Sequence, residues 1–140
     1  MEYRKGPNEL YHAFIQIESA GGERFGGYRA LVDTGSTKCT IPRKDNELLF
    51  HLKKAGTDLA VDTALGPASF DWVTVPKMIL MKEVDVKLGN IRFASKLEET
   101  DLRTENTKAW LGDEYMVGAN FIDEFRVTMT RGNSIVFEKP

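Results

Sequence analysis

A single stretch of the chain places a carboxylate at the point where an apolar strand gives way to a glycine turn. Residues 30–37 read Ala-Leu-Val-Asp-Thr-Gly-Ser-Thr, with Asp33 as the acid. The strand fixes the position of the carboxylate, and Gly35 is expected to allow a backbone path that is closed to other residues. The hydroxyls of Thr34 and Ser36 can orient the carboxylate by hydrogen bonding. A side chain held in this way is suited to acid–base chemistry.

This string resembles the catalytic loop of aspartic proteases. It occurs once, and 140 residues leave no room for two lobes. Because the chemistry of that family needs two facing carboxylates, the resemblance implies a homodimer with one Asp33 from each subunit, as in the retropepsin-like, retroviral-type proteases. One carboxylate would take a proton from a bound water while the protonated one polarises the peptide carbonyl. By the same resemblance Thr34 and Gly35 complete the catalytic loop, and no metal or organic cofactor is required.

A second string extends the resemblance. In retropepsin-like proteins an apolar-apolar-Gly element packs against the catalytic loop and precedes a short helix, and Met116-Val117-Gly118 fits this description. Asn120 is expected to cap the helix. The buried face of the helix is expected to consist of Phe121, Ile122 and Phe125.

Between the two strings, residues 63–68 join two β-prone segments, 58–62 and 69–75. The tip is small, turn-prone and uncharged, which favours a hairpin that could move. The resemblance identifies it as a flap that closes over an extended peptide. Residues expected to contact the substrate are Ser36 in the catalytic loop and Asp62, Thr63, Ala64, Leu65 and Gly66 in the flap.

Asp62 lies in a near copy of the catalytic string, Leu59-Ala60-Val61-Asp62-Thr63-Ala64. Ala64 replaces the glycine that the string needs, so Asp62 is interpreted as part of the flap base and not as a second catalytic aspartate.

The rest of the chain shows mostly strand and turn signals. Residues 11–18 and 28–32 predict a hairpin around the turn at residues 20–23. Asp45 is expected to cap a helix that ends at Gly56 and buries one face. That face would contain Leu48, Leu49 and Leu52.

Further strands are expected at residues 38–41, 77–88 (with an interruption near Lys82-Glu83), 91–97, 126–130 and 134–138, with turns at Gly89-Asn90 and Gly132-Asn133. Residues 100–112 are polar with weak periodicity and are interpreted as a long surface loop. The resemblance to retropepsin-like proteases implies that the terminal strand 134–138 builds the dimer sheet, so that its deletion should weaken pairing more than it perturbs the monomer core.

Together these signals predict an all-β, single-lobe acid-protease barrel with one or two short helices, formed by a single domain of residues 1–140 and homodimeric. The hydrophobic fraction of 41% and charged fraction of 29% are compatible with any globular domain of this length.

Composition limits the partners. The net charge is −2 and the basic residues are scattered, which argues against nucleic acid. A lone Cys39 excludes an intramolecular disulfide and a cysteine-rich metal site. His12 and His51 lack a spaced partner that would indicate zinc, so no metal site is expected. The acidic residues 98–101 are interpreted as a solvated face.

No apolar run approaches the ~18 residues of a membrane span, so the chain is expected to be soluble and without a membrane partner. If Met1 is the native start, the absence of a signal peptide favours the cytoplasm over secretion.

The sequence therefore predicts an aspartic endopeptidase that cleaves extended, apolar polypeptide segments between the two Asp33 carboxylates of a homodimer. The alternative is a dimeric module of the same fold that binds peptides or acts as a scaffold and cuts nothing. A weaker alternative is an adaptor in which Asp33 is only a turn residue.

Overall fold

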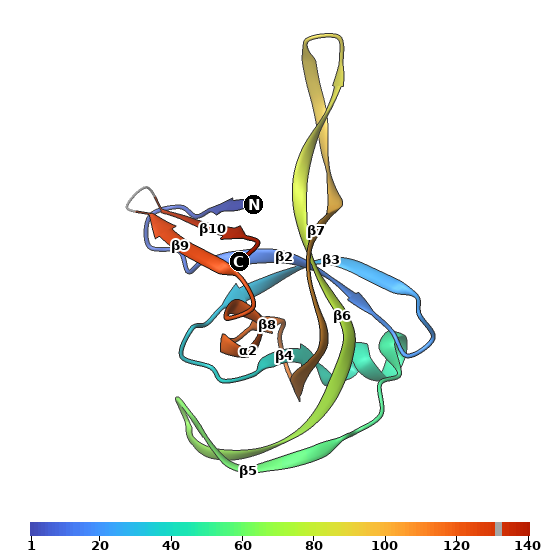
Figure 1. Ribbon diagram of the computed structural model, residues 1–140, viewed down its shortest axis with the longest axis vertical. Coiled ribbons are helices and arrows are strands. Elements are labelled where there is room, and N and C mark those ends of the chain that lie inside the picture. Colours follow the sequence, from blue (N-terminus) through green and yellow to red (C-terminus); the bar gives the residue numbers. More distant parts are fainter. Residues whose placement is uncertain (131–132) are drawn as a thin grey trace.

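The computed structural model describes residues 1–130 and 133–140. The expected turn at Gly132-Asn133 therefore lies partly outside the described residues. The elements follow one another along the chain (Figure 1) as β1 (Glu2–Arg4), β2 (His12–Glu18), β3 (Arg24–Val32), β4 (Cys39–Pro42), α1 (Arg43–Asp45), the π-helical turn η1 (Asn46–Phe50), β5 (Gly56–Thr63), β6 (Gly66–Leu88), β7 (Ile91–Gly112), β8 (Met116–Val117), α2 (Ala119–Ile122), β9 (Arg126–Thr130) and β10 (Ser134–Glu138). In this part of the chain, none of the helices has the length and apolar character needed to cross a membrane.

A seven-stranded sheet forms the body, in the order β2-β3-β8-β4-β7-β6-β5. β2 also pairs with β6, so the sheet closes on itself and leaves β5 outside the ring. The expectation of an all-β barrel with short helices is confirmed.

The first hairpin is formed by β2 and β3 and confirms the prediction from the alternating pattern. Ala13, Ile15 and Ile17 of β2 are completely buried, whereas Phe14 and Gln16 between them are only half-buried. This period of two is typical of a strand with one face on the core. The hairpin delivers Val32, and with it Asp33, to the end of β3.

β1, β10 and β9 make a second, three-stranded sheet. β10 lies between the other two, and its Ile135 and Phe137 side chains are fully buried. The Phe137 ring packs edge-on against Tyr3, Phe121 and Phe125. Deleting the terminal strand would therefore also remove part of the monomer core, and the expectation that this strand builds a dimer sheet stays a prediction.

The interpretation of residues 100–112 as a surface loop is also wrong, because they form the second half of β7. Half of its buried side chains are small or β-branched, and they lie among charged residues that are exposed. Strands tolerate this pattern, since threonine packs well on a pleated surface. The buried positions are Leu102, Thr104, Thr107, Ala109, Trp110 and Leu111.

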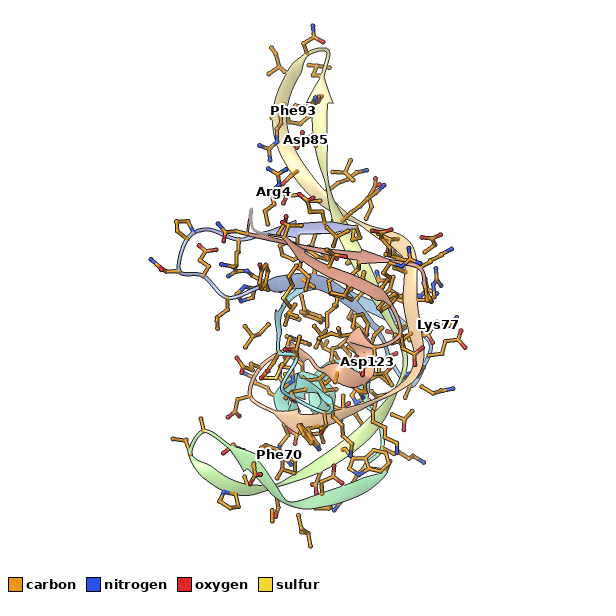
Figure 2. The ribbon with its side chains drawn as sticks, turned by 60° about the vertical axis from the view of Figure 1, so that its left-hand side comes forward. Arg4, Phe70, Lys77, Asp85, Phe93 and Asp123 are labelled. Atoms are coloured by element: carbon orange, nitrogen blue, oxygen red, sulfur yellow. The ribbon has the colours of Figure 1, made fainter. Side chains whose placement is uncertain are left out.

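No interruption occurs near Lys82-Glu83. β6 and β7 instead continue beyond the body as a two-stranded arm, residues 82–88 and 91–98, which projects at the top of Figure 1. Figure 2 shows Phe93 and Asp85 on this arm and Phe70 at the opposite end of the molecule. One face of the arm carries the apolar cross-strand pairs Val86↔Ala94 and Leu88↔Ile91.

The helix expected from Asp45 to Gly56 is shorter and begins earlier, at Arg43 directly after Pro42. It ends at His51, whose left-handed conformation (φ 52°) stops the helical path, and Gly56 belongs to β5. Asp45 makes no capping bond, and its carboxylate accepts a hydrogen bond from the Tyr115 hydroxyl at 2.5 Å. Of the expected apolar face, Leu52 is buried but Leu48 is exposed.

Candidate active site

Asp33 is held at the junction of three strands. β3, which leads into it, runs parallel to β8, with Leu31 opposite Met116 and Val32 opposite Val117. The Asp33 amide continues this ladder by donating to the Val117 carbonyl at 3.0 Å. β4, which leaves the loop, pairs with the other side of β8. Residues 33–38 are therefore fixed at both ends to the strand that carries the second string.

Hydrogen bonds inside the loop orient the Asp33 carboxylate. Its Oδ1 accepts from the Gly35 amide at 2.9 Å, and the Asp33 carbonyl accepts from the Ser36 amide at 3.2 Å. The Ser36 hydroxyl donates to the Lys38 carbonyl at 2.8 Å and does not reach the carboxylate. The amide of Gly35, and not the hydroxyl of Ser36, is thus the group that orients Asp33.

Gly35 does not adopt the left-handed backbone conformation in which glycine is favoured, so the expected reason for this glycine is wrong. The structure instead explains this glycine by the lack of space for a side chain at position 35. A Cβ atom at position 35 would lie 3.3 Å from Asp33 Oδ1, which is tighter than ordinary van der Waals contact.

The segment after β8 closes the loop from behind. The Ala119 amide donates to the Ser36 carbonyl at 2.7 Å. Phe121 and Ile122 are buried as expected and Phe125 is half-buried, but Asn120 does not cap the helix, which begins after Gly118. The Asn120 side chain instead accepts from the Cys39 amide at 3.0 Å and donates to the Lys108 carbonyl at 2.8 Å, which ties α2 to β4 and β7.

Exposure separates the loop into an outer and an inner part. Asp33 is half-buried, Thr34 and Gly35 are exposed, and Ser36 is half-buried. Among the described residues, no cation forms an ion pair with Asp33.

Cys39 lies behind the loop, fully buried, and burial raises the pKa of its thiol to about 12. Since the thiolate is the reactive form, this cysteine is inert and structural.

The flap hairpin is formed by β5 and β6. Thr63 pairs with Gly66, which leaves Ala64 and Leu65 as a two-residue turn. The Thr63 hydroxyl donates to the Gly66 carbonyl at 2.6 Å and accepts from the Leu65 amide at 3.2 Å. Gly66 has a φ of +105°, a conformation that other residues rarely adopt. The Leu65 side chain is fully exposed at the tip.

Asp62 lies beside this tip, paired with Pro67, and not at the base of the hairpin as expected. The hairpin is longer than the sequence suggested, because β5 begins at Gly56.

The structure therefore gathers the expected site residues into two groups, Asp33 to Ser36 in the loop and Asp62 to Gly66 in the flap. Both groups point to the same side of the molecule in the view of Figure 1. In residues 1–130 and 133–140, no hydrogen bond or ion pair joins the flap tip directly to the loop.

Sequence reasoning missed a cluster that links the two groups at the flap base. Lys38, three residues after Gly35, forms an ion pair with Asp58 of β5, and Trp110 donates its indole N–H to the same carboxylate at 2.9 Å. The hydrogen bond from Lys38 is the main cause that holds the pKa of Asp58 below its usual range, and the one from Trp110 adds to it. Nothing in the spacing of these residues indicates the contact, since it depends on how β4, β5 and β7 meet.

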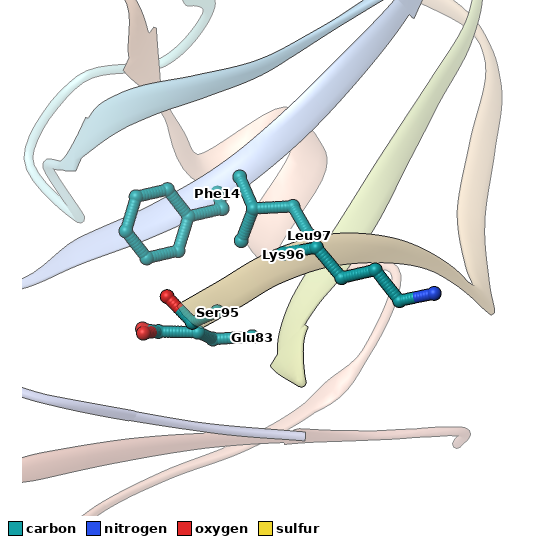
Figure 3. Close-up of a pocket in the computed structure, with 5 residues that line it drawn as sticks. All are labelled: Phe14, Glu83, Ser95, Lys96 and Leu97. Carbon is teal, nitrogen blue, oxygen red and sulfur yellow. The ribbon is translucent and has the colours of Figure 1, made fainter. Parts of the chain in front are cut away.

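A cavity of about 300 Å³ lies elsewhere, at the base of the arm. It is bounded by Phe14, Glu83, Ser95, Lys96 and Leu97, and Figure 3 shows Lys96 pointing away from the Phe14 ring. None of these residues belongs to the expected site. Within the described part of the chain, no three histidine, cysteine or acidic side chains are grouped so that they could hold a metal ion.

Comparison with known proteins found a similarity to solved structures but none to family models or curated sequences. Neither the protein-family models nor the curated proteins matched the sequence. Among solved structures, the fold matches the crystal structure of a retropepsin-like aspartic protease from Rickettsia conorii with a TM-score of 0.58. The match covers 98% of this chain and 88% of that chain at 11% sequence identity. The chain therefore has the retropepsin-like fold.

Proposed function

We propose that this chain is an aspartic endopeptidase that acts as a homodimer. The observation that carries the proposal is the placement of Asp33: an oriented, half-exposed carboxylate at the end of β3, in a loop braced by β8, within a retropepsin-like fold. Among the described residues no cation pairs with this carboxylate, so the Gly35 amide is the only hydrogen-bond donor that offsets the cost of partly removing it from water, which favours a chemical role over a structural one.

The reaction would need the loops of two subunits. Across a twofold axis the two Asp33 carboxylates cannot both ionise cheaply, so they would share a proton. The ionised one would accept a proton from water as the water attacks the peptide carbonyl, and the protonated one would donate to the carbonyl oxygen. Thr34 is exposed next to Asp33 and is proposed to bond across the axis, which would hold the pair rigid.

The flap supplies the peptide site in this proposal. Its tip is apolar and exposed at Leu65, and the hairpin can pair with an extended peptide backbone while excluding water. Asp62, Thr63, Ala64 and Gly66 are proposed to contact the substrate through the same hairpin, and Ser36 through the loop.

Asp33→Asn tests the proposal, because an amide is nearly isosteric with the carboxylate but cannot act as the base. A diverse peptide pool is incubated with the wild type and the variant, with and without pepstatin, and products are identified by mass spectrometry. Cleavage by the wild type that is blocked by pepstatin and lost in Asp33→Asn is expected. Asp123→Asn, a change to an exposed carboxylate beside α2, is the matched control and should retain activity.

Mixed dimers separate a shared site from a site within one chain. If each site takes Asp33 from both subunits, a 1:1 mixture of wild type and Asp33→Asn should keep about a quarter of the activity of the same total amount of wild type, since pairing is random. Half of the activity would mean that each chain works alone. Absence of cleavage under all conditions, with an intact dimer, would favour the alternative of a peptide-binding or scaffold module.

A further inference from the structure

We propose that Lys38 and Asp58 are a positioning pair that fixes where the flap hairpin bends and couples that point to the catalytic loop. The inference rests on the proposed function, because a flap matters only if the groove binds a peptide. It assigns to these two residues a role that the catalytic string and the hairpin do not themselves define.

The Asp58 carboxylate is held from two directions. It accepts hydrogen bonds from the Lys38 ammonium and, at 2.9 Å, from the Trp110 indole. The Lys38 ammonium also lies 5.0 Å from the ring centroid of Trp72 and 5.8 Å from that of Trp110, within the range of cation–π attraction. The Lys38 side chain keeps 19% of its exposure and that of Asp58 33%, so the pair is only partly screened by solvent.

Asp58 stands at a change in the hairpin. Before it, the hairpin is firmly anchored: Gly56 pairs with Trp72, and Thr57 donates to Asp71 at 2.8 Å. After it, the register shifts before pairing resumes at Val61.

The shift contains Ala60 in a left-handed conformation, with a φ of 53°. A non-glycine residue in this region is strained and marks an irregularity in the strand. Beyond it nearly every side chain up to Leu65 is exposed. Asp58 is thus the residue directly before the irregularity whose side chain ties β5 to the body of the molecule, and the exposed part of the hairpin follows the irregularity.

Lys38 stands at an equivalent boundary in the loop. Its carbonyl accepts from the Ser36 hydroxyl, and β4 begins with the next residue. The side chain that holds the flap and the main chain that holds Ser36 therefore belong to the same residue. Lys38 thus connects the flap base directly to the catalytic loop.

This arrangement predicts how the pair acts on catalysis. Loss of the Lys38–Asp58 pair leaves Asp33 and its hydrogen bonds in place. The hairpin can then bend at more than one point. Closure over a peptide then costs more conformational entropy, so KM should rise more than kcat falls.

The test uses Asp58→Asn and Lys38→Met, two variants that remove the charge from opposite sides and keep most of the side-chain volume. Lys54→Met is the matched control, because Lys54 forms an ion pair with Asp71 at the same hairpin base at 3.3 Å but does not contact the loop segment. Lys38→Arg keeps the cation and is the conservative variant. Far-UV circular dichroism checks that each variant is folded.

The first measurement is hydrogen–deuterium exchange of the amides of residues 57–70. Both charge-removing variants should exchange about three- to tenfold faster there than the wild type, as expected for a partly exposed, hydrogen-bonded ion pair. Lys54→Met and Lys38→Arg should stay near the wild-type rate. Equal exchange in Lys38→Met and Lys54→Met would overturn the proposal.

The second measurement is steady-state kinetics on one peptide substrate. KM should increase about three- to tenfold in Asp58→Asn and Lys38→Met with a smaller change in kcat, following the same loss of interaction. A fall in kcat with KM unchanged would contradict a positioning role. If no variant and no wild type cleaves any peptide, the endopeptidase proposal fails, while the exchange measurement still decides whether Lys38 and Asp58 fix the bend.

Discussion

Gly118 lies so close to the main chain of Lys38 that a Cβ atom at position 118 would stand 2.3 Å from the Lys38 carbonyl oxygen. The same atom would lie 2.8 Å from the Ser36 carbonyl oxygen. Both neighbours are backbone atoms, which cannot turn aside as a flexible side chain would. The glycine of the second string is therefore required by the loop of residues 33–38 that it supports.

Gly118→Ala is expected to displace the loop and to destabilise the protein by about 1–3 kcal/mol, the usual cost of overpacking. The melting temperature and the rate of peptide cleavage are measured, and both should be lower than in the wild type. Gly21→Ala is the control, because a Cβ there would meet only ordinary contacts, the nearest at 3.7 Å. A stable and fully active Gly118→Ala would show that the loop tolerates a shift of its support.

Leu65→Asp at the flap tip should leave thermal stability within about 0.5 kcal/mol, because the side chain is fully exposed and buries nothing in the monomer. The proposed contact with apolar substrate segments should be lost, so KM should rise and kcat should fall. A melting curve is recorded beside kinetics on a fluorogenic peptide. Unchanged kinetics would remove Leu65 from the peptide site.

The base of the flap should stay anchored at mildly acidic pH. The pKa of Asp58 is lowered first by its hydrogen bond to Lys38, and that of Asp71 first by its hydrogen bond to Thr57. A lowered pKa in the folded state means that each carboxylate contributes fully above its unfolded pKa, about 3.9, and loses its contribution as pH falls through the lower folded value.

Tryptophan emission can follow this, because the chain has two tryptophans and both lie at the flap base. Emission should be steady from about pH 7 to pH 5 and change only below the ordinary aspartate range. This change in emission should come before global acid unfolding, and it should differ in Asp58→Asn, which has no carboxyl group at position 58. A transition centred above pH 5 that disappears in this variant would contradict the lowered pKa of Asp58.

The projecting arm should be dispensable for folding of the monomer. Its outer apolar residues Leu88, Ile91 and Phe93 are 78%, 71% and 65% exposed. Deleting residues 85–88 and 91–95 would join the cross-strand partners Val84 and Lys96 through the native Gly89-Asn90 turn. Unfolding free energy should change by less than about 1 kcal/mol, as for other exposed segments.

Ile79→Ala on the same strand provides the contrast. Ile79 is completely buried, and truncating it should cost about 2–5 kcal/mol. Urea denaturation measures both changes. If shortening the arm proved as costly as Ile79→Ala, the arm would have to be covered in solution.

The elements around the candidate site could be predicted because their signals are local. An apolar strand that ends in Asp33, a small, turn-prone hairpin tip at residues 63–68 and an apolar pair before Gly118 are each contained in a few consecutive residues. The first half of β7 was expected in part, whereas its second half was mistaken for a loop, because threonine and alanine take half of its buried positions and carry little hydrophobic signal.

The errors around the helix have a related cause. Leu48 looks like a core residue in sequence but is 63% exposed, while Asn46 is buried and bonds to the main chain of Leu52. Tertiary packing decides which side of so short a helix is covered, and propensity does not. The pairing of Lys38 with Asp58 is beyond local reasoning altogether, since it depends on three strands that meet only in the folded barrel.

The three-stranded sheet of β1, β10 and β9 has a consequence for how the chain folds. Met1 and Phe137 exchange two main-chain hydrogen bonds, so the first and last strands of the sequence are direct partners. During synthesis β1 emerges first and stays unpaired until β10 has followed, and closing so long a loop is slow. Until then the unpaired edge of β1 is a place where two nascent chains can pair wrongly, which makes the order of emergence, and not only final stability, a determinant of the yield of correctly folded protein.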